Sequence, residues 1–140
     1  MTETLIENRI YLFDTTLRDG AQTQGGDFNP ADKAMIAREL NELGIDYVEG
    51  GWPGANPTDS KFFENPPTLK RAIFTSFGMT KRPGRSADND PGLSEVVNAP
   101  VGAVCLVGKT WDYHVDVALG IEQSENVAMI GESVAHTIAK

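Results

Sequence analysis

The chain has 140 residues, of which 40% are hydrophobic and 23% charged, so it suits one globular domain with a real core and is unlike a disordered chain. Its net charge of −8 argues against nucleic acid as the main partner, because binding to phosphates needs a basic face. The single cysteine, Cys105, excludes an intrachain disulfide and a cysteine metal cluster.

The chain has no apolar run of membrane-spanning length. Residues 1–9 lack the basic start and apolar stretch of a secretory signal. We therefore expect a cytoplasmic protein that binds neither membranes nor nucleic acid.

Strand and helix signals alternate along the chain. The β-branched and aromatic residues 9–14 predict a buried strand. A helix is expected over residues 29–44, with Asn29 as its cap, Pro30 in its first turn and Gly44 as its stop. Further strands are expected over 45–51, 71–79 and 101–109, further helices over 56–65 and 88–99 (the latter capped by Asp90), and one or two closing helices over 110–140.

Two of these helices have an apolar stripe that we expect to face the core. The stripe of the first helix comprises Ile36, Leu40 and Leu43. The stripe of the last helix comprises Val127, Ile130, Val134 and Ile138.

Regular strand–helix alternation predicts an α/β fold with a parallel sheet. Two architectures fit this pattern: a small doubly wound sheet, or part of an eight-fold barrel. In both architectures, ligands bind at the carboxyl ends of the strands.

Polar and charged side chains recur at that end of every expected strand. The first strand is followed by Arg18, Asp19 and Gln22, the second ends at Glu49, the third contains Thr75 near its end, and the fourth ends at Lys109.

Arg18 and Asp19 have two possible roles. As neighbours in a loop they could form an exposed ion pair of little energetic value. Their position directly after a strand, with Gly20 allowing a sharp turn, favours a functional role. Asp19 could ligate a divalent cation and Arg18 could hold a developing oxyanion, which together suit chemistry at a carbonyl group.

The role of Glu49 stays open, because a salt bridge and a site carboxylate are equally compatible with its position. In a salt bridge its partner would be a lysine or arginine of a neighbouring strand, and Lys109 is the expected one unless Lys109 itself contacts an anion. Cys105 is expected to be a core thiol, His136 a surface residue and His114 a weak candidate only. The glycine-rich segment 50–57 lacks the lysine and hydroxyl residue of a phosphate loop, so we expect a structural loop there.

Four segments carry a resemblance to a known family. The stretch FDTTLRDGAQTQG (13–25) resembles the first-strand signature of isopropylmalate synthase, homocitrate synthase, citramalate synthase and hydroxymethylglutaryl-CoA lyase. The citramalate-synthase branch is resembled most by VEGGWPGANPTD (48–59), FGMTKRPGRSADNDPGL (77–93) and VGKTWDYHVDVAL (107–119).

The resemblance implies a TIM barrel that condenses acetyl-CoA with a 2-keto acid, here pyruvate, at a divalent ion such as Mn²⁺, Mg²⁺ or Zn²⁺. It implies that Asp19 ligates the metal, that Arg18 binds the keto oxygen and stabilises the alkoxide, and that Gln22 and Glu49 face the same pocket. Thr75 and Lys109 match less distinctive positions that bind substrate. The sibling activities, isopropylmalate or homocitrate synthesis or the reverse lyase reaction, remain alternatives.

The chain also departs from the family pattern. The family completes its metal site with a His-x-His pair on a later strand, and residues 1–140 contain no such pair. We therefore expect residues 1–140 to form the N-terminal half of a TIM-barrel domain, truncated before the later strands, within an enzyme that is a homodimer at full length. We expect the isolated chain to lack turnover and to pair through its open edge strands or aggregate. A half-barrel that binds a ligand or partner without catalysis is the alternative of another class.

Overall fold

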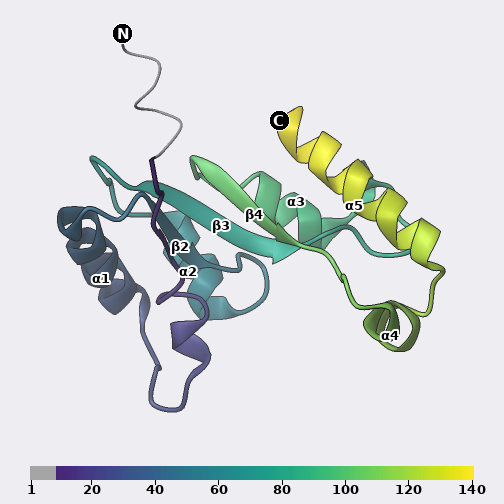
Figure 1. Cartoon of the computed structure of the whole chain (residues 1–140). Helices are drawn as coiled ribbons and strands as arrows, with labels where there is room; N and C mark the ends of the chain where they lie inside the picture. The colour runs from purple at the N-terminus through teal and green to yellow at the C-terminus, as the bar shows by residue number, and fades with distance from the viewer. Residues whose placement is uncertain (1–8) are drawn as a thin grey trace, which may run out of the picture.

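The computed structural model describes residues 9–140, which form one parallel sheet with helices between the strands (Figure 1). The strands are β1 (Phe13–Asp14), β2 (Tyr47–Gly51), β3 (Ile73–Met79) and β4 (Ala103–Val107), and they lie side by side in the order β1-β2-β3-β4. Every neighbouring pair is parallel, which confirms the α/β class. The strand order does not reverse among these strands, so the doubly wound alternative is wrong for the described residues.

Helices connect and follow the strands as the sequence predicts. They are α1 (Pro30–Leu43), α2 (Pro57–Glu64), α3 (Pro91–Val97), α4 (Asp112–His114) and α5 (Gln123–Ile138), with short 3₁₀ turns at Gly20–Gln22 and Ala87–Asn89 and a π-helical turn at Val115–Leu119.

Helix α1 begins and ends at the predicted residues. The side-chain oxygen of Asn29 accepts hydrogen bonds from the backbone amides of Ala31 and Asp32, at 2.8 and 3.0 Å. The carboxylate of Asp32 accepts one in return from the amide of Asn29, which completes a capping box. Gly44 ends the helix in the left-handed conformation, at φ 95°.

Two expected elements are shorter than predicted. Only Phe13 and Asp14 of the segment 9–14 form a regular strand. The backbone amide of Leu12 donates to the Asp46 carboxylate at 2.9 Å and not to a backbone carbonyl of a neighbouring strand. The predicted helix over 88–99 is divided by Asp90, whose extended backbone ends the 3₁₀ turn and caps α3.

The core lies between the sheet and the helices on one of its faces. It is built from apolar side chains of β1's loop, β2, β3 and the helices, chiefly Leu17, Ala37, Val48, Phe62, Phe63 and Phe74. Side chains alternate between the faces of a strand, so the neighbours of these core residues lie on the opposite face. There Phe13 and Ile73 remain 45% and 39% exposed, which leaves part of that sheet face uncovered within residues 9–140.

The predicted apolar stripes are partly wrong. Leu43 of α1 is exposed, and the buried positions of that helix are Lys33, Ala37 and Asn41. In α5 the stripe residues Val127, Val134 and Ile138 are exposed. Periodicity identified the helices correctly, but α1 and α5 bury polar side chains that make specific hydrogen bonds, and this sets which face turns inward.

None of the helices in residues 9–140 combines the length and apolar character that crossing a bilayer requires. The expectation that the N-terminal segment carries no secretory signal concerns mainly residues 1–8, which lie outside the described residues.

Candidate active site at the carboxyl ends of the strands

The loop after β1 is a tight turn that fixes where Arg18 points. The carbonyl of Thr15 accepts from three successive amides, those of residues 18, 19 and 20, at 3.1, 2.8 and 3.2 Å. The carboxylate of Asp14 holds the start of the turn by accepting from the amide and hydroxyl of Thr16. Leu17 is fully buried in the core, which anchors the turn. Arg18, the next residue, instead reaches Glu49, which lies on the face of the sheet opposite the core.

Arg18 is held by three neighbours. Its Nε donates to Oε2 of Glu49 at 2.7 Å, and its Nη1 donates to Oδ1 of Asp19 at 3.2 Å. Its guanidinium carbon lies 4.1 Å from the centre of the Phe77 ring, a cation–π contact. The Arg18 side chain is 20% exposed, so the guanidinium is fixed in place but still reachable by a ligand.

Glu49 pairs with Arg18, and the expectation that Lys109 is its partner is wrong. Glu49 is 1% exposed, so its charge needs a close opposite charge, which Arg18 supplies from the neighbouring strand end. Lys109 lies beyond the end of β4 and lines a different cavity. Of the two roles that stayed open for Glu49, the structure shows the salt bridge, with Arg18 as the partner.

A second buried ion pair fixes the end of β2. Nζ of Lys33 on α1 bonds the carboxylate of Asp59 on α2 and donates to the carbonyl of Gly50 at 3.1 Å. The other oxygen of Asp59 accepts from the amide of Trp52 at 2.9 Å. At Gly51 the backbone has φ 145° and a Cβ would meet Asp59 at 2.6 Å, so only glycine fits.

The segment 50–57 is a structural loop, as expected, and specific contacts with two helices hold it in place. The Lys33–Asp59 pair ties it to two helices and sets the position of Trp52, whose ring meets that of Phe77 edge-on with centroids 5.5 Å apart. The sequence interpretation missed Lys33, Asp59, Trp52 and Phe77. Lysine in an amphipathic helix normally faces solvent, so nothing in the pattern of α1 marked Lys33 as buried.

Cys105 is half-buried and lies on the face of the sheet that carries Glu49, which corrects the expectation of a core thiol. Burial raises the pKa of the Cys105 thiol, and the nearby Glu49 carboxylate raises it further. The thiol therefore stays protonated at neutral pH, which argues against a nucleophilic role.

A cavity of about 250 Å³ opens beside Arg18. Its lining includes Gln22, Lys33, Trp52 and Asn56, so the structure brings Gln22 to Arg18 as the sequence predicts. Asp19 is adjacent and its side chain is 65% exposed. Thr75 pairs with Glu49 across the β2–β3 ladder, but it is 1% exposed and its hydroxyl donates to the carbonyl of Ile73, so a ligand does not reach it in this arrangement.

The described residues do not form a complete metal site. Within residues 9–140 no three His, Cys, Asp or Glu side chains come together in a way that could hold a metal ion. Asp19 offers one exposed carboxylate, while the carboxylate of Glu49 is engaged by Arg18. His114 packs against Trp111 at 4.5 Å between ring centroids, and the surface assignment of His136 is wrong, since its side chain is 14% exposed and lies 3.3 Å from Asp88.

Comparisons with known proteins assign the chain to a family. The HMGL-like family model matches residues 9–138. The chain belongs to the HMGL-like family. This family membership confirms the resemblance drawn from the DTTLRDG segment, and it identifies the four parallel strand–helix units as part of a TIM barrel.

Several relatives that the chain resembles are named synthases. The chain is 43% identical over 130 residues to the (R)-citramalate synthase of Aquifex aeolicus, covering 91% of this chain and 25% of that protein. It is 44% identical over 131 residues to the (R)-citramalate synthase of Synechocystis, covering 91% of this chain and 24% of that protein. The 2-isopropylmalate synthase of Solidesulfovibrio magneticus is 30% identical over 134 residues, which are 96% of this chain and 26% of that protein.

The chain thus spans about a quarter of the length of the curated relatives that it matches.

Proposed function

We propose that this chain forms part of the active site of an acyltransferase that condenses acetyl-CoA with a 2-keto acid, pyruvate in the first place, to give citramalate. The observation that carries the proposal is the position of Arg18. A buried carboxylate and an aromatic ring hold its guanidinium at the carboxyl ends of the strands, beside an open cavity. Over nine tenths or more of this chain, the relatives named citramalate synthase share 40–44% identity with it and those named 2-isopropylmalate synthase share 30–32%, and this difference favours pyruvate.

Arg18 suits the charge that develops in such a reaction. The methyl carbon of the acetyl thioester loses a proton and attacks the ketone carbon, and the ketone oxygen becomes an alkoxide. Water then cleaves the thioester, so that acetyl-CoA, pyruvate and water give citramalate, free CoA and a proton. Two nitrogens of Arg18 are engaged by Glu49 and Asp19, and no hydrogen bond within residues 9–140 uses the third. That nitrogen can donate to the keto acid and its alkoxide.

The other residues have supporting roles in this proposal. Glu49 orients Arg18 and balances part of its charge, and Gln22 lines the side of the cavity where the keto acid would lie. Lys109 would bind an anionic group of a substrate from the end of β4. Thr75 would support Glu49 through the sheet rather than touch the substrate.

Asp19 is proposed as one ligand of the divalent ion. Within residues 9–140 Asp19 is not joined by other metal-ligating side chains, so a complete site would need further ligands from another part of a polypeptide or from a second chain. The same incompleteness favours the second candidate, a half-barrel that binds a keto acid without turning it over.

A complementation experiment tests the function. The 140-residue chain is co-expressed with the remaining three quarters of the Aquifex aeolicus (R)-citramalate synthase, and CoA release is followed with a thiol reagent. We expect release with acetyl-CoA and pyruvate that exceeds release with 2-ketoisovalerate or 2-ketoglutarate. Arg18→Lys should lower kcat by about a hundredfold or more, since it removes the planar pair of donors.

The exposed Arg85→Gln is the matched control and should leave the rate unchanged. A rate that survives Arg18→Lys unaltered would overturn the assignment of Arg18. A stable complex that releases no CoA would favour the non-catalytic candidate.

A further inference from the structure

Strand β2 carries a bulge directly after Glu49. Glu49 lies opposite Thr75 in the β2–β3 ladder. Gly51 lies opposite the next residue of β3, so Gly50 is the extra residue of the bulge. Because a bulge bends its strand and re-aims the side chains beside it, the direction of the Glu49 side chain depends on how the bulge is held.

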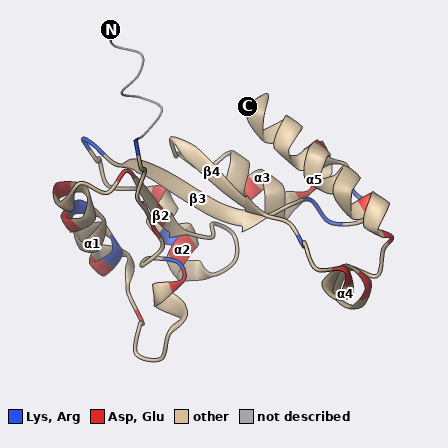
Figure 2. Cartoon of the chain, in the orientation of Figure 1, with Lys and Arg blue, Asp and Glu red and all other residues tan. Residues whose placement is uncertain are grey.

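The Lys33–Asp59 ion pair holds both sides of this bulge. Charged residues are frequent on α1 and α2 (Figure 2), and these two are the buried ones among them. Nζ of Lys33 donates to the carbonyl of Gly50, the residue directly after Glu49, at 3.1 Å. One oxygen of Asp59 bonds Lys33, and the other accepts from the amide of Trp52 at 2.9 Å. The two charged side chains are 2% and 9% exposed, so water does not replace these contacts.

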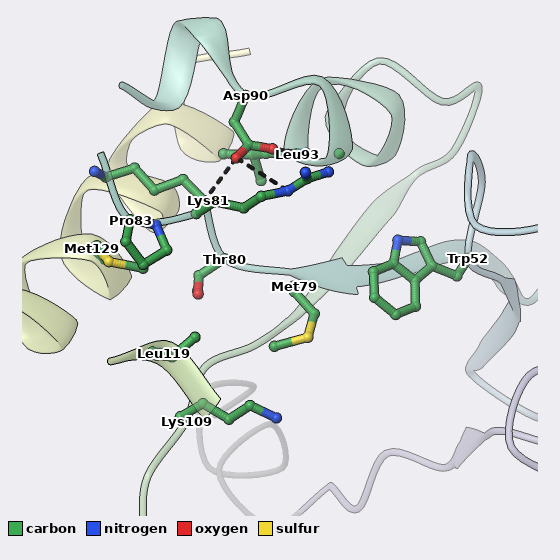
Figure 3. A pocket seen from close by; sticks show the side chains of 12 residues that line it. Trp52, Met79, Thr80, Lys81, Pro83, Asp90, Leu93, Lys109, Leu119 and Met129 are labelled. Carbon is green, nitrogen blue, oxygen red and sulfur yellow. Dashed lines mark hydrogen bonds and ion pairs between the residues drawn. The ribbon is translucent and has the colours of Figure 1, made fainter. Parts of the chain in front are cut away.

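Both ends of the segment that this pair holds reach Arg18. At one end, Oε2 of Glu49 accepts from Nε of Arg18 at 2.7 Å. At the other end, the Trp52 ring meets the Phe77 ring edge-on, and the Arg18 guanidinium lies over that same Phe77 ring. Trp52 also borders an open cavity (Figure 3), so packing alone does not fix the indole, and the contact of its amide with Asp59 is needed to place it.

We propose that Lys33 and Asp59 are positioning residues for Arg18 in the condensation, acting through the bulge that directs Glu49. This inference rests on the proposed function, because that function gives Arg18 its part in a reaction. The Lys33 ammonium and the Asp59 carboxylate are engaged by each other and by backbone groups, so neither is assigned a contact with substrate. The effect can still be large, since a misplacement of about 1 Å can lower a rate by about a hundredfold.

The test replaces the whole pair, because loss of one partner would leave a buried charge unpaired. Lys33→Met/Asp59→Leu keeps apolar side chains at both positions but removes every group that bonds the bulge. In the 140-residue chain, labelling of Arg18 by phenylglyoxal, measured by peptide mass spectrometry, should become about threefold faster or more, because the guanidinium is held less firmly. The exposed Arg82 is the internal reference, and urea unfolding checks that the variant is folded.

Lys33→Arg keeps the test valid if the double variant does not fold. It retains the positive charge opposite Asp59, but its planar guanidinium does not donate from the position of Nζ, so labelling of Arg18 should still become about twofold faster. The matched control is Arg9→Met/Asp46→Asn, which removes an ion pair next to the amino end of β2 and should leave the labelling of Arg18 unchanged. Unchanged labelling in the folded Lys33 variants would overturn the inference.

The complemented complex gives a second readout, which a purely structural role would not move. Arg18→Lys should lower kcat about a hundredfold in the wild-type background but about tenfold or less in the Lys33→Met/Asp59→Leu background, because the pair acts through Arg18. An equal loss in both backgrounds would contradict the inference. Failure of the proposed function looks different: the labelling of Arg18 responds as expected, but the complex gives no product with any 2-keto acid.

Discussion

Arg18 and Glu49 stand 31 residues apart in the sequence, yet Nε of the arginine lies 2.7 Å from Oε2 of the glutamate. The glutamate is almost fully buried and the arginine is mostly buried. The contact therefore joins the loop after β1 to the end of β2, and each residue supplies the charge that the other needs.

Loss of the arginine alone should destabilise the fold. Arg18→Met leaves the Glu49 carboxylate buried without its partner, and we expect a loss of about 3 kcal/mol in the free energy of unfolding. The double variant Arg18→Met/Glu49→Gln should recover most of that loss, because no unpaired charge remains. Urea unfolding of the wild type, both single variants and the double variant measures the coupling. Additive single effects would show that the contact is not energetically important.

Asp19 should matter for metal binding and not for stability. Its side chain is mostly exposed, so Asp19→Asn should change the free energy of unfolding by less than about 0.5 kcal/mol. In the co-expressed complex the same change should weaken Mn²⁺ binding by more than about tenfold, because it removes a charged oxygen ligand. Titration with Mn²⁺ followed by electron paramagnetic resonance measures the affinity. Unchanged affinity would remove Asp19 from the ligand set.

Two glycines should respond to alanine in opposite directions. At Gly131, within α5, an added Cβ meets no atom within 4 Å, so Gly131→Ala should stabilise the protein by about 0.5–1 kcal/mol. Gly51→Ala would press a Cβ against the Asp59 carboxylate in a backbone conformation that L-residues avoid, and we expect a clear loss of stability. Thermal unfolding of the two variants compares them. A stabilised Gly51→Ala would mean that the Lys33–Asp59 pair does not fix this segment.

The charge of Asp90 should make stability depend on pH in the acidic range. Burial alone would raise the pKa of Asp90, but the backbone amides of Leu93 and Arg82 donate to its carboxylate and bring the pKa below its ordinary value of 3.8. A carboxylate with a lowered pKa contributes stability above that ordinary value, and the contribution is lost as the pH falls through the lower folded-state pKa.

Asp90→Asn keeps the hydrogen-bond acceptor but not the charge, so its unfolding free energy should fall less steeply with decreasing pH below about 4. Urea unfolding at a series of pH values compares the slopes of the two proteins. Parallel slopes would show that Asp90 has the same pKa in the folded and unfolded chains.

The partly uncovered sheet face and the two open edges should make the isolated chain associate. Parallel sheets are normally covered on both faces, and open edge strands pair with other chains. We expect light scattering after size-exclusion chromatography to show dimers or larger species, and we expect no release of CoA from acetyl-CoA and pyruvate. Turnover by the pure, monomeric chain would contradict this prediction.

Much of the fold could be predicted because local signals agree with the final arrangement. Asn29, Pro30 and Gly44 mark the ends of α1 by capping chemistry that depends only on neighbours in the sequence. The candidate site residues next to strand ends, Arg18, Asp19 and Glu49, could be proposed for the same reason. Partners across the sheet could not be assigned, and Lys109 was chosen for Glu49 where the structure has Arg18.

The remaining differences come from polar groups that are buried for tertiary reasons. Lys33 points inward because its Nζ donates to the Asp59 carboxylate and to the carbonyl of Gly50, and these partners belong to other elements. The inward face of α5 is set partly by Ser133, which accepts from the amide of Lys81 at 2.9 Å, so a stripe of valines and isoleucines turns outward instead. Hydrophobic periodicity does not register such contacts.

The order of strands in the sheet has a consequence for how the chain folds. Every strand pairs with the strand that precedes it in the sequence, and none has to be inserted between two others. Each pairing therefore closes only the short loop between consecutive strands, and this lowers the entropic barrier to forming it. A polypeptide leaving the ribosome could add one strand and one helix at a time, with each new unit docking on a surface that is already formed.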